Sequence, residues 1–152
     1  VGLPDYDAQK GDRPYQVKLL LEGITNKGMD ELTVLARSWL QAPQVKAVQD
    51  CREVAYEKPQ RAYVLTATGG EPEIALDVVS DHPLYNPAFV VSNWGKDDVG
   101  VVRVKGQTPA AGLVRQGVVR DTRGRQQLIV WLEGVWADPQ TLNIKISGAA
   151  SK

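Results

Sequence analysis

Hydrophobic and polar residues alternate over much of this chain, and a two-residue period is typical of β-strands with one buried face. The alternation is clearest in residues 73–80, 127–135 and 141–147, each of which places its aliphatic side chains on one face. The predicted strands are 15–24, 45–48, 51–56, 61–68, 73–80, both arms of a hairpin within 85–105, 113–120, 127–135 and 141–147.

The hairpin at 85–105 is predicted to form the centre of the sheet, because two apolar runs flank a turn-rich segment at 95–98. Its core candidates are Phe89, Val91, Val102 and Val104. Its rim candidates are Asn86, Trp94, Asp97 and Asp98, with Arg103 on the outward face. A second hairpin turn is predicted at 121–124, which has the sequence Asp-Thr-Arg-Gly.

One segment has the 3.6-residue period of a helix. Apolar residues of 29–41 form a single stripe, and Pro43 ends the segment. The stripe consists of Met29, Leu32, Leu35, Ala36, Trp39 and Leu40, and we expect it to be buried.

The regular spacing of short strands predicts a mainly β fold, an antiparallel β-sandwich of the jelly-roll or immunoglobulin-like kind, with one N-terminal helix. No helix intervenes after residue 45, so parallel βαβ units are not expected. Residues 1–43 are predicted to form a loop, a strand and the helix, and are a candidate linker to a preceding domain. Residues 44–148 form the sandwich, and 149–152 are a tail.

Charge and hydropathy argue against two classes of partner. Lys plus Arg and Asp plus Glu each number 18 in 152 residues, and a net charge of zero argues against nucleic acid. No apolar run approaches the about 18 residues that a membrane-spanning helix needs. The chain begins at Val1 without a signal peptide, so we expect a mature product or a piece of a longer protein.

Catalytic and metal motifs are scarce. The sequence has one histidine, His82, and no nucleophile-elbow motif with a serine that this histidine could activate. The one cysteine, Cys51, has no second cysteine for a disulfide and no zinc-ligand spacing around it. No cofactor is predicted. Calcium at Asp97-Asp98, Asp81 or Asp138 is the alternative to ordinary solvated turns. Glycosidase chemistry would need a carboxylate pair, for which the candidates are Glu53, Glu71, Glu73 and Glu133.

Aromatic and basic residues are the better candidates for ligand binding. Trp94, Trp131 and Trp136 lie at strand ends or on a second strand face, where an indole can stack on a sugar ring. Arginines gather around the turn at 121–124, and guanidinium groups bind carboxylate or sulfate bidentately. The predicted binding arginines are Arg103, Arg115, Arg120 and Arg123, with Lys105 and Arg125 as neighbours.

Several segments between residues 56 and 147 resemble a family of terminal β-sandwich domains. They are NPAFVVSNWG, the valine-rich strand after it, Arg-Gln-Gly at 115–117, LIVWLEG and LNIKIS. The family occurs in secreted bacterial polysaccharide lyases and glycoside hydrolases. The resemblance implies a secreted or periplasmic origin and an accessory, carbohydrate-contacting role, with catalytic residues in another domain.

The leading hypothesis is a non-catalytic module of a secreted carbohydrate-active protein that binds or positions a polysaccharide, including an acidic one. A structural domain that packs on a neighbouring catalytic domain through the helix stripe is the first alternative. A small hydrolase, or a lyase that uses Tyr with Arg or Lys, is the second.

Overall fold

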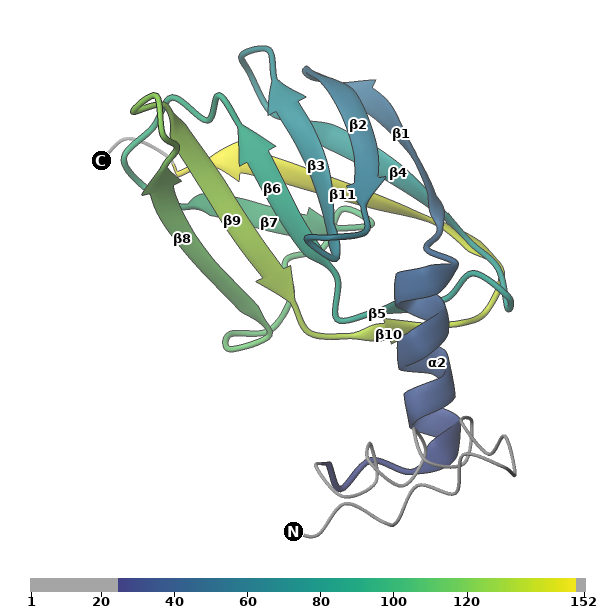
Figure 1. Cartoon of the computed structure of the whole chain (residues 1–152). Coiled ribbons are helices and arrows are strands. Elements are labelled where there is room, and N and C mark those ends of the chain that lie inside the picture. Colours follow the sequence, from purple (N-terminus) through teal and green to yellow (C-terminus); the bar gives the residue numbers. More distant parts are fainter. Residues whose placement is uncertain (1–24, 150–152) are drawn as a thin grey trace, which may run out of the picture. The chain divides into compact units, whose positions relative to one another are not determined.

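A computed structural model describes residues 25–149 and shows one helix followed by short strands (Figure 1). It divides into two compact units, residues 1–33 and 34–152, which are described separately. The elements are α2 (Met29–Leu40), β1 (Gln44–Gln49), β2 (Cys51–Glu57), β3 (Ala62–Ala67), β4 (Glu73–Val78), β5 (Leu84–Tyr85), β6 (Ala88–Ser92), β7 (Gly100–Val104), β8 (Val114–Arg120), β9 (Gln126–Leu132), β10 (Val135–Trp136) and β11 (Gln140–Gly148).

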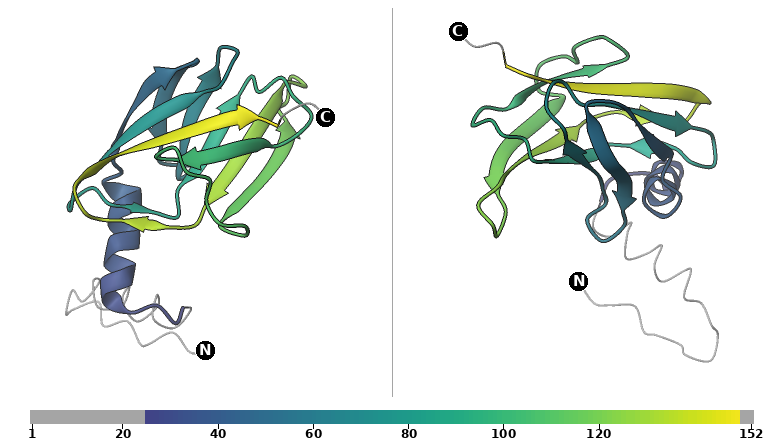
Figure 2. Two further views of the ribbon diagram at one scale, coloured as in Figure 1. Left: turned by 180° about the vertical axis from the view of Figure 1, so that it is seen from behind. Right: turned by 90° about the horizontal axis from the view of Figure 1, so that it is seen from above.

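The strands of the second unit form a two-layered β-sandwich, so the predicted mainly β fold is confirmed. A four-stranded sheet has the order β1-β4-β11-β7, and a five-stranded sheet has the order β2-β3-β6-β9-β8. The two layers are seen from above in Figure 2. A short ladder of β10 and β5 lies at one end of the sandwich.

The core lies between the two sheets and consists of the alternating aliphatic residues that the sequence pattern predicts. Phe89, Leu128 and Val130 from the five-stranded sheet are fully buried, as are Leu142 and Ile144 from the four-stranded sheet. Most strands therefore present one face to the core and the other outward, as is ordinary in antiparallel sandwiches, although Ala62 and Ala75 are buried on the outer faces.

The predicted hairpin at 85–105 is wrong. Its arms β6 and β7 lie in different sheets, and they meet across the core through Phe89 and Val91 on one side and Val102 on the other. The reason is that β6 already has β3 and β9 as hydrogen-bonded neighbours. The turn-rich segment, with Asn93 at φ 57° and Gly95 at φ 69°, therefore carries the chain from one layer to the other.

One strand pair departs from the predicted antiparallel pairing, because β3 and β6 run parallel. The chain between them crosses through β4 in the other sheet and β5 at the end of the sandwich, and so returns in the same direction without a helix.

The hairpin turn at 121–124 is confirmed and joins β8 to β9. The Asp121 carboxylate accepts hydrogen bonds from the backbone N–H groups of Arg123 (2.8 Å) and Arg125 (2.9 Å), and Gly124 adopts φ 75°. These bonds and the Arg125 guanidinium stabilise the ionised carboxylate, so the pKa of Asp121 is lowered.

The predicted helix is confirmed as α2, but its apolar stripe is not uniformly buried. In the second unit Ser38 is buried and Trp39 is half-buried, whereas Ala36 is exposed and Leu40 is 70% exposed. The Trp39 ring lies 3.9 Å from the Arg61 guanidinium. Among the described residues, no helix combines the length and apolarity needed to cross a membrane. The predicted strand at 15–24 lies outside those residues.

Candidate functional site

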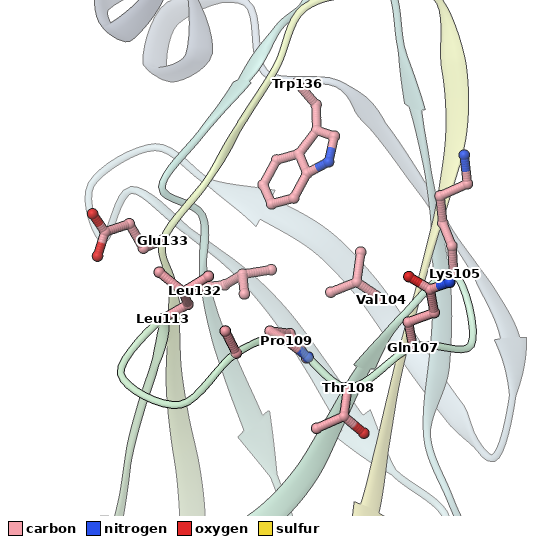
Figure 3. A pocket seen from close by; sticks show the side chains of 10 residues that line it. Val104, Lys105, Gln107, Thr108, Pro109, Leu113, Leu132, Glu133 and Trp136 are labelled. Atoms are coloured by element: carbon pink, nitrogen blue, oxygen red, sulfur yellow. The ribbon is translucent and has the colours of Figure 1, made fainter.

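A cleft of about 400 Å³ lies at the end of the sandwich where β7, β9 and β10 terminate (Figure 3). We call it the Trp136 cleft. It is lined by Val104, Lys105, Gln107, Thr108, Pro109, Ala110, Leu113, Leu132, Glu133 and Trp136. Its volume falls within the roughly 300–1,000 Å³ range of small-molecule sites.

Two backbone features shape the cleft. Lys105 (φ 50°) and Gly106 (φ 79°) form a tight turn closed by reciprocal backbone hydrogen bonds between Val104 and Gln107. This turn sends the β7–β8 connection back beneath the end of β9. There the N–H of Glu133 donates to the carbonyl of Leu113 at 2.7 Å and fixes the far side of the connection.

Trp136 forms one wall and is held from two directions. It pairs with Leu84 in the β10–β5 ladder, and its ring packs against the backbone of Gly134 so closely that a Cβ there would lie 2.3 Å from the ring. Gly134 is itself fixed, since its N–H donates to Asn86 Oδ1 (2.9 Å) and its carbonyl accepts from the Asn86 N–H (2.8 Å). The indole is therefore pre-positioned and faces Val104 and Leu132 across the cleft (Figure 3).

Opposite charges flank this apolar interior. Lys105 lies on one side, with its Nζ 3.4 Å from Gln140 Oε1, and the exposed Glu133 lies on the other (Figure 3). Gln107 and Thr108 add hydrogen-bonding groups at the mouth. An aromatic wall and apolar floor with polar groups at the rim suit a flat, amphipathic ligand such as a sugar ring.

A second arrangement lies on the outer face of the five-stranded sheet. Arg115 on β8 and Trp131 on β9 are directly opposed, with the guanidinium carbon 5.0 Å from the ring centroid. The sequence predicted both residues as ligand contacts, and the structure brings these two together. They stabilise each other by a cation–π contact on an accessible strand face.

Trp94 does not belong to any exposed rim, and its predicted ligand contact is corrected here. It is only 4% exposed and joins the core cluster, and its indole N–H donates to the carbonyl of Asp98 at 2.9 Å. Its ring packs against Gly100, where a Cβ would lie 3.2 Å from it. The residue seals the end of the sandwich instead of facing a ligand.

The fold separates Arg103 and Arg115 from the predicted arginine cluster, whereas Arg120, Arg123 and Arg125 remain together at the β8–β9 turn. Arg103 lies on the four-stranded sheet and donates to Ser147 Oγ. Arg120 lies at the end of β8, 3.7 Å from Asp97, and Arg123 is exposed at the hairpin turn. The sequence spacing was misleading because alternate residues of one strand face opposite sides and β7 belongs to the other layer.

Three of the candidate metal-binding or catalytic groups, Asp97, His82 and Cys51, have structural partners. Asp97 accepts from Gln126 and pairs with Arg120, and within residues 25–149 no three His, Cys, Asp or Glu residues are grouped to hold a metal ion. His82 is exposed, and its Nδ1 donates to the Gln41 carbonyl at 2.9 Å. The Cys51 thiol donates to the Glu73 carbonyl, and burial raises its pKa, which disfavours a reactive thiolate.

Three of the four candidate carboxylates have other partners. Glu71 is ion-paired with Lys145 at 2.7 Å, which lowers the pKa of Glu71, whereas a general acid needs a raised one. Glu73 accepts from Asn143, and Glu53 accepts from Thr66. This leaves Glu133 as the one candidate at the Trp136 cleft.

Two of the described tyrosines are poorly suited to act as a base in lyase chemistry. Burial raises the pKa values of Tyr56 and Tyr63, which keeps both phenols protonated.

Sequence reasoning identified only one member of the cleft as a ligand contact, Trp136. It missed Gln107, Pro109, Leu113 and Leu132, and it assigned Val104 to the core. These residues carry no chemical motif, and they become neighbours only because the two sheets pack together. A composition signal existed only in the Pro-Gly-rich β7–β8 connection.

No protein-family model matches the chain, and no curated protein or solved structure matches it significantly.

Proposed function

We propose that residues 44–148 form a non-catalytic β-sandwich module of a secreted or periplasmic carbohydrate-active protein, and that the module binds polysaccharide in the Trp136 cleft. The observation that carries the proposal is the pre-positioned indole across an apolar cleft from Val104 and Leu132. Family resemblance in residues 56–147 supports the same role.

In this proposal the apolar face of a pyranose ring stacks on Trp136. Hydroxyl groups of the sugar hydrogen-bond to Gln107 and Glu133 at the rim, and Lys105 favours a carboxylated or sulfated unit. The open shape of the cleft suits one unit of a chain, or its end, better than a long segment.

Affinity electrophoresis against neutral and acidic polysaccharides, followed by calorimetry, tests the proposal. We expect Trp136→Ala to weaken binding by roughly 2–12-fold, from an aromatic contact of about 0.5–1.5 kcal/mol. Lys105→Ala changes an exposed side chain, so it tests the rim without threatening the fold. Retardation by none of the polysaccharides, or equal retardation of wild type and both folded variants, contradicts the proposal.

A second candidate is a domain that packs on a neighbouring protein domain through the C-terminal part of α2. It is favoured by one observation, the 70% exposure of Leu40 beside the exposed Ala36. If this surface is a docking site, a hydrophobic dye binds the isolated chain and Leu40→Lys abolishes dye binding. The absence of dye binding contradicts this candidate.

A further inference from the structure

The outer faces of the two sheets differ in chemistry. On the four-stranded sheet, charged and polar side chains satisfy one another: Lys145 pairs with Glu71 at 2.7 Å, and Asn143 donates to Glu73 at 2.8 Å. On the five-stranded sheet, the middle strands β3, β6 and β9 carry no charged side chain on their outer face. This face, which we call the neutral face, is turned toward the viewer in Figure 1.

The strand register arranges the neutral face in three rows that cross the whole sheet from β2 to β8. The first row is Glu57, Ala62, Ala88, Trp131 and Arg115; the second is Ala55, Val64, Val90, Ile129 and Gly117; the third is Arg52, Thr66, Ser92, Gln127 and Val119. The central row is entirely apolar, and Ile129 within it is 39% exposed.

The first and central rows read as their own complements when they are reversed, whereas the third row does not, because a charged Arg52 stands at one of its ends and an apolar Val119 at the other. The first row begins with an acid, Glu57, and ends with a base, Arg115, and neither forms an ion pair within residues 25–149. In the central row, small residues stand at both ends, and β-branched residues stand between them. We propose that a second copy of this chain packs face to face on the neutral face, related by a twofold axis parallel to the strands.

That axis places β2 of one copy over β8 of the other. Glu57 then faces the partner's Arg115, and Val64 faces the partner's Ile129, while Val90 meets its own counterpart on the axis. Ala55 faces the partner's Gly117, at which an added Cβ would meet nothing within 4 Å in the single chain. Aligned sheets cross at about 30°, so the pairing is closest in the central rows and looser at the corners.

The size of the face predicts a weak dimer. Strands about 4.8 Å apart and same-face residues about 6.7 Å apart give a footprint on the order of 400 Å². A standard stable interface buries about 800 Å² per partner, so we expect association at micromolar or higher concentration.

Sedimentation velocity of the full chain over about 1–500 μM tests the proposal. We expect a monomer–dimer equilibrium that Ile129→Glu weakens at least tenfold, because the new carboxylate would be buried against the partner's Val64. Thr141→Lys is the control: it adds a charge to an exposed position on the four-stranded sheet, opposite Asp77, and leaves association unchanged. Thermal unfolding by circular dichroism at low concentration confirms that both variants fold.

Charge reversal tests the order of the strands across the interface. Glu57→Lys and Arg115→Glu each weaken association, because each places like charges opposite one another, and the double variant restores it. A chain that is monomeric at every concentration, or an Ile129→Glu variant that still dimerises, overturns the proposal. Failure of the double variant overturns the proposed twofold arrangement. If the wild-type chain does not self-associate and Ile129→Glu loses polysaccharide binding, the neutral face binds sugar and the proposed dimer is overturned.

The outcome is independent of the Trp136 cleft. Trp136→Ala tests the cleft alone, and Ile129→Glu tests the neutral face alone, so either proposal can fail without the other.

Discussion

Gly134→Ala is the most direct test of how the fold positions the indole of Trp136. The added methyl would lie 2.3, 2.8 and 2.9 Å from three ring carbons of Trp136. Ordinary carbon contacts are about 3.5–4.0 Å, so the ring has to move by roughly 1 Å or more. It cannot do so freely, because its backbone is paired with Leu84 in the β5–β10 ladder and its ring packs on the core.

Overpacking of this kind costs typically 1–3 kcal/mol. No backbone strain adds to this cost, since Gly134 does not have a left-handed φ. With an m-value of about 1–3 kcal/mol/M in urea, a loss of about 2 kcal/mol lowers the unfolding midpoint by about 1 M. Urea unfolding followed by circular dichroism measures this shift, and calorimetry with a bound polysaccharide measures the accompanying loss of affinity.

Gly117→Ala is the matched control, because a Cβ there meets nothing within 4 Å and its φ is also outside the left-handed region. We expect unchanged or slightly higher stability at low protein concentration, since glycine in a strand is destabilising relative to alanine by about 0.5–1 kcal/mol. If Gly134→Ala is as stable as Gly117→Ala, the close packing of Trp136 against Gly134 is refuted, and with it the pre-positioned wall of the cleft.

Three further predictions concern the scaffold. Leu128→Ala removes a fully buried side chain and lowers the free energy of unfolding by about 2–5 kcal/mol in urea; a change below 1 kcal/mol would contradict its place in the core. The lowered pKa of Asp121 stabilises the fold above the unfolded-state pKa of about 3.9, and this contribution disappears as pH falls through the lower folded-state value. Wild type should therefore lose stability relative to Asp121→Asn below about pH 4, and an NMR titration giving an ordinary pKa would refute this. Burial raises the pKa of Cys51, so its thiol should react with a disulfide reagent at pH 8 several-fold more slowly in the folded than in the denatured chain; equal rates would argue against the partly buried, hydrogen-bonded thiol.

The predicted strands with clear alternation were confirmed because local patterning and burial agree there. Ile74, Leu128 and Ile144 all face the core as predicted. The turn at 121–124 could likewise be predicted, since the Asp121 side chain accepts hydrogen bonds from backbone N–H groups only two and four residues away. Such features are determined by interactions within a few residues.

The strand pairing of β6 and β7, within residues 85–105, could not be predicted in the same way. Two apolar runs around a turn are compatible with a hairpin in one sheet and with a crossing between two sheets. What decides between them is competition for the edges of β6, which β3 and β9 occupy from distant parts of the sequence. The burial of Trp94 has the same cause, because the segment that crosses between the sheets directs the indole into the core.

By itself, the sequence determined the fold class, most strand boundaries, the helix and most residues of the core, because periodicity records which side of each element is buried. Only the tertiary structure decided that Arg103 and Arg115 lie apart from the arginines of the β8–β9 turn, that Trp94 is internal and that Trp136 lines a cleft with Leu132 and Val104. The physical reason is that these relationships depend on which strands share a sheet and how two layers close over one another. Those long-range choices leave no periodic trace in the sequence.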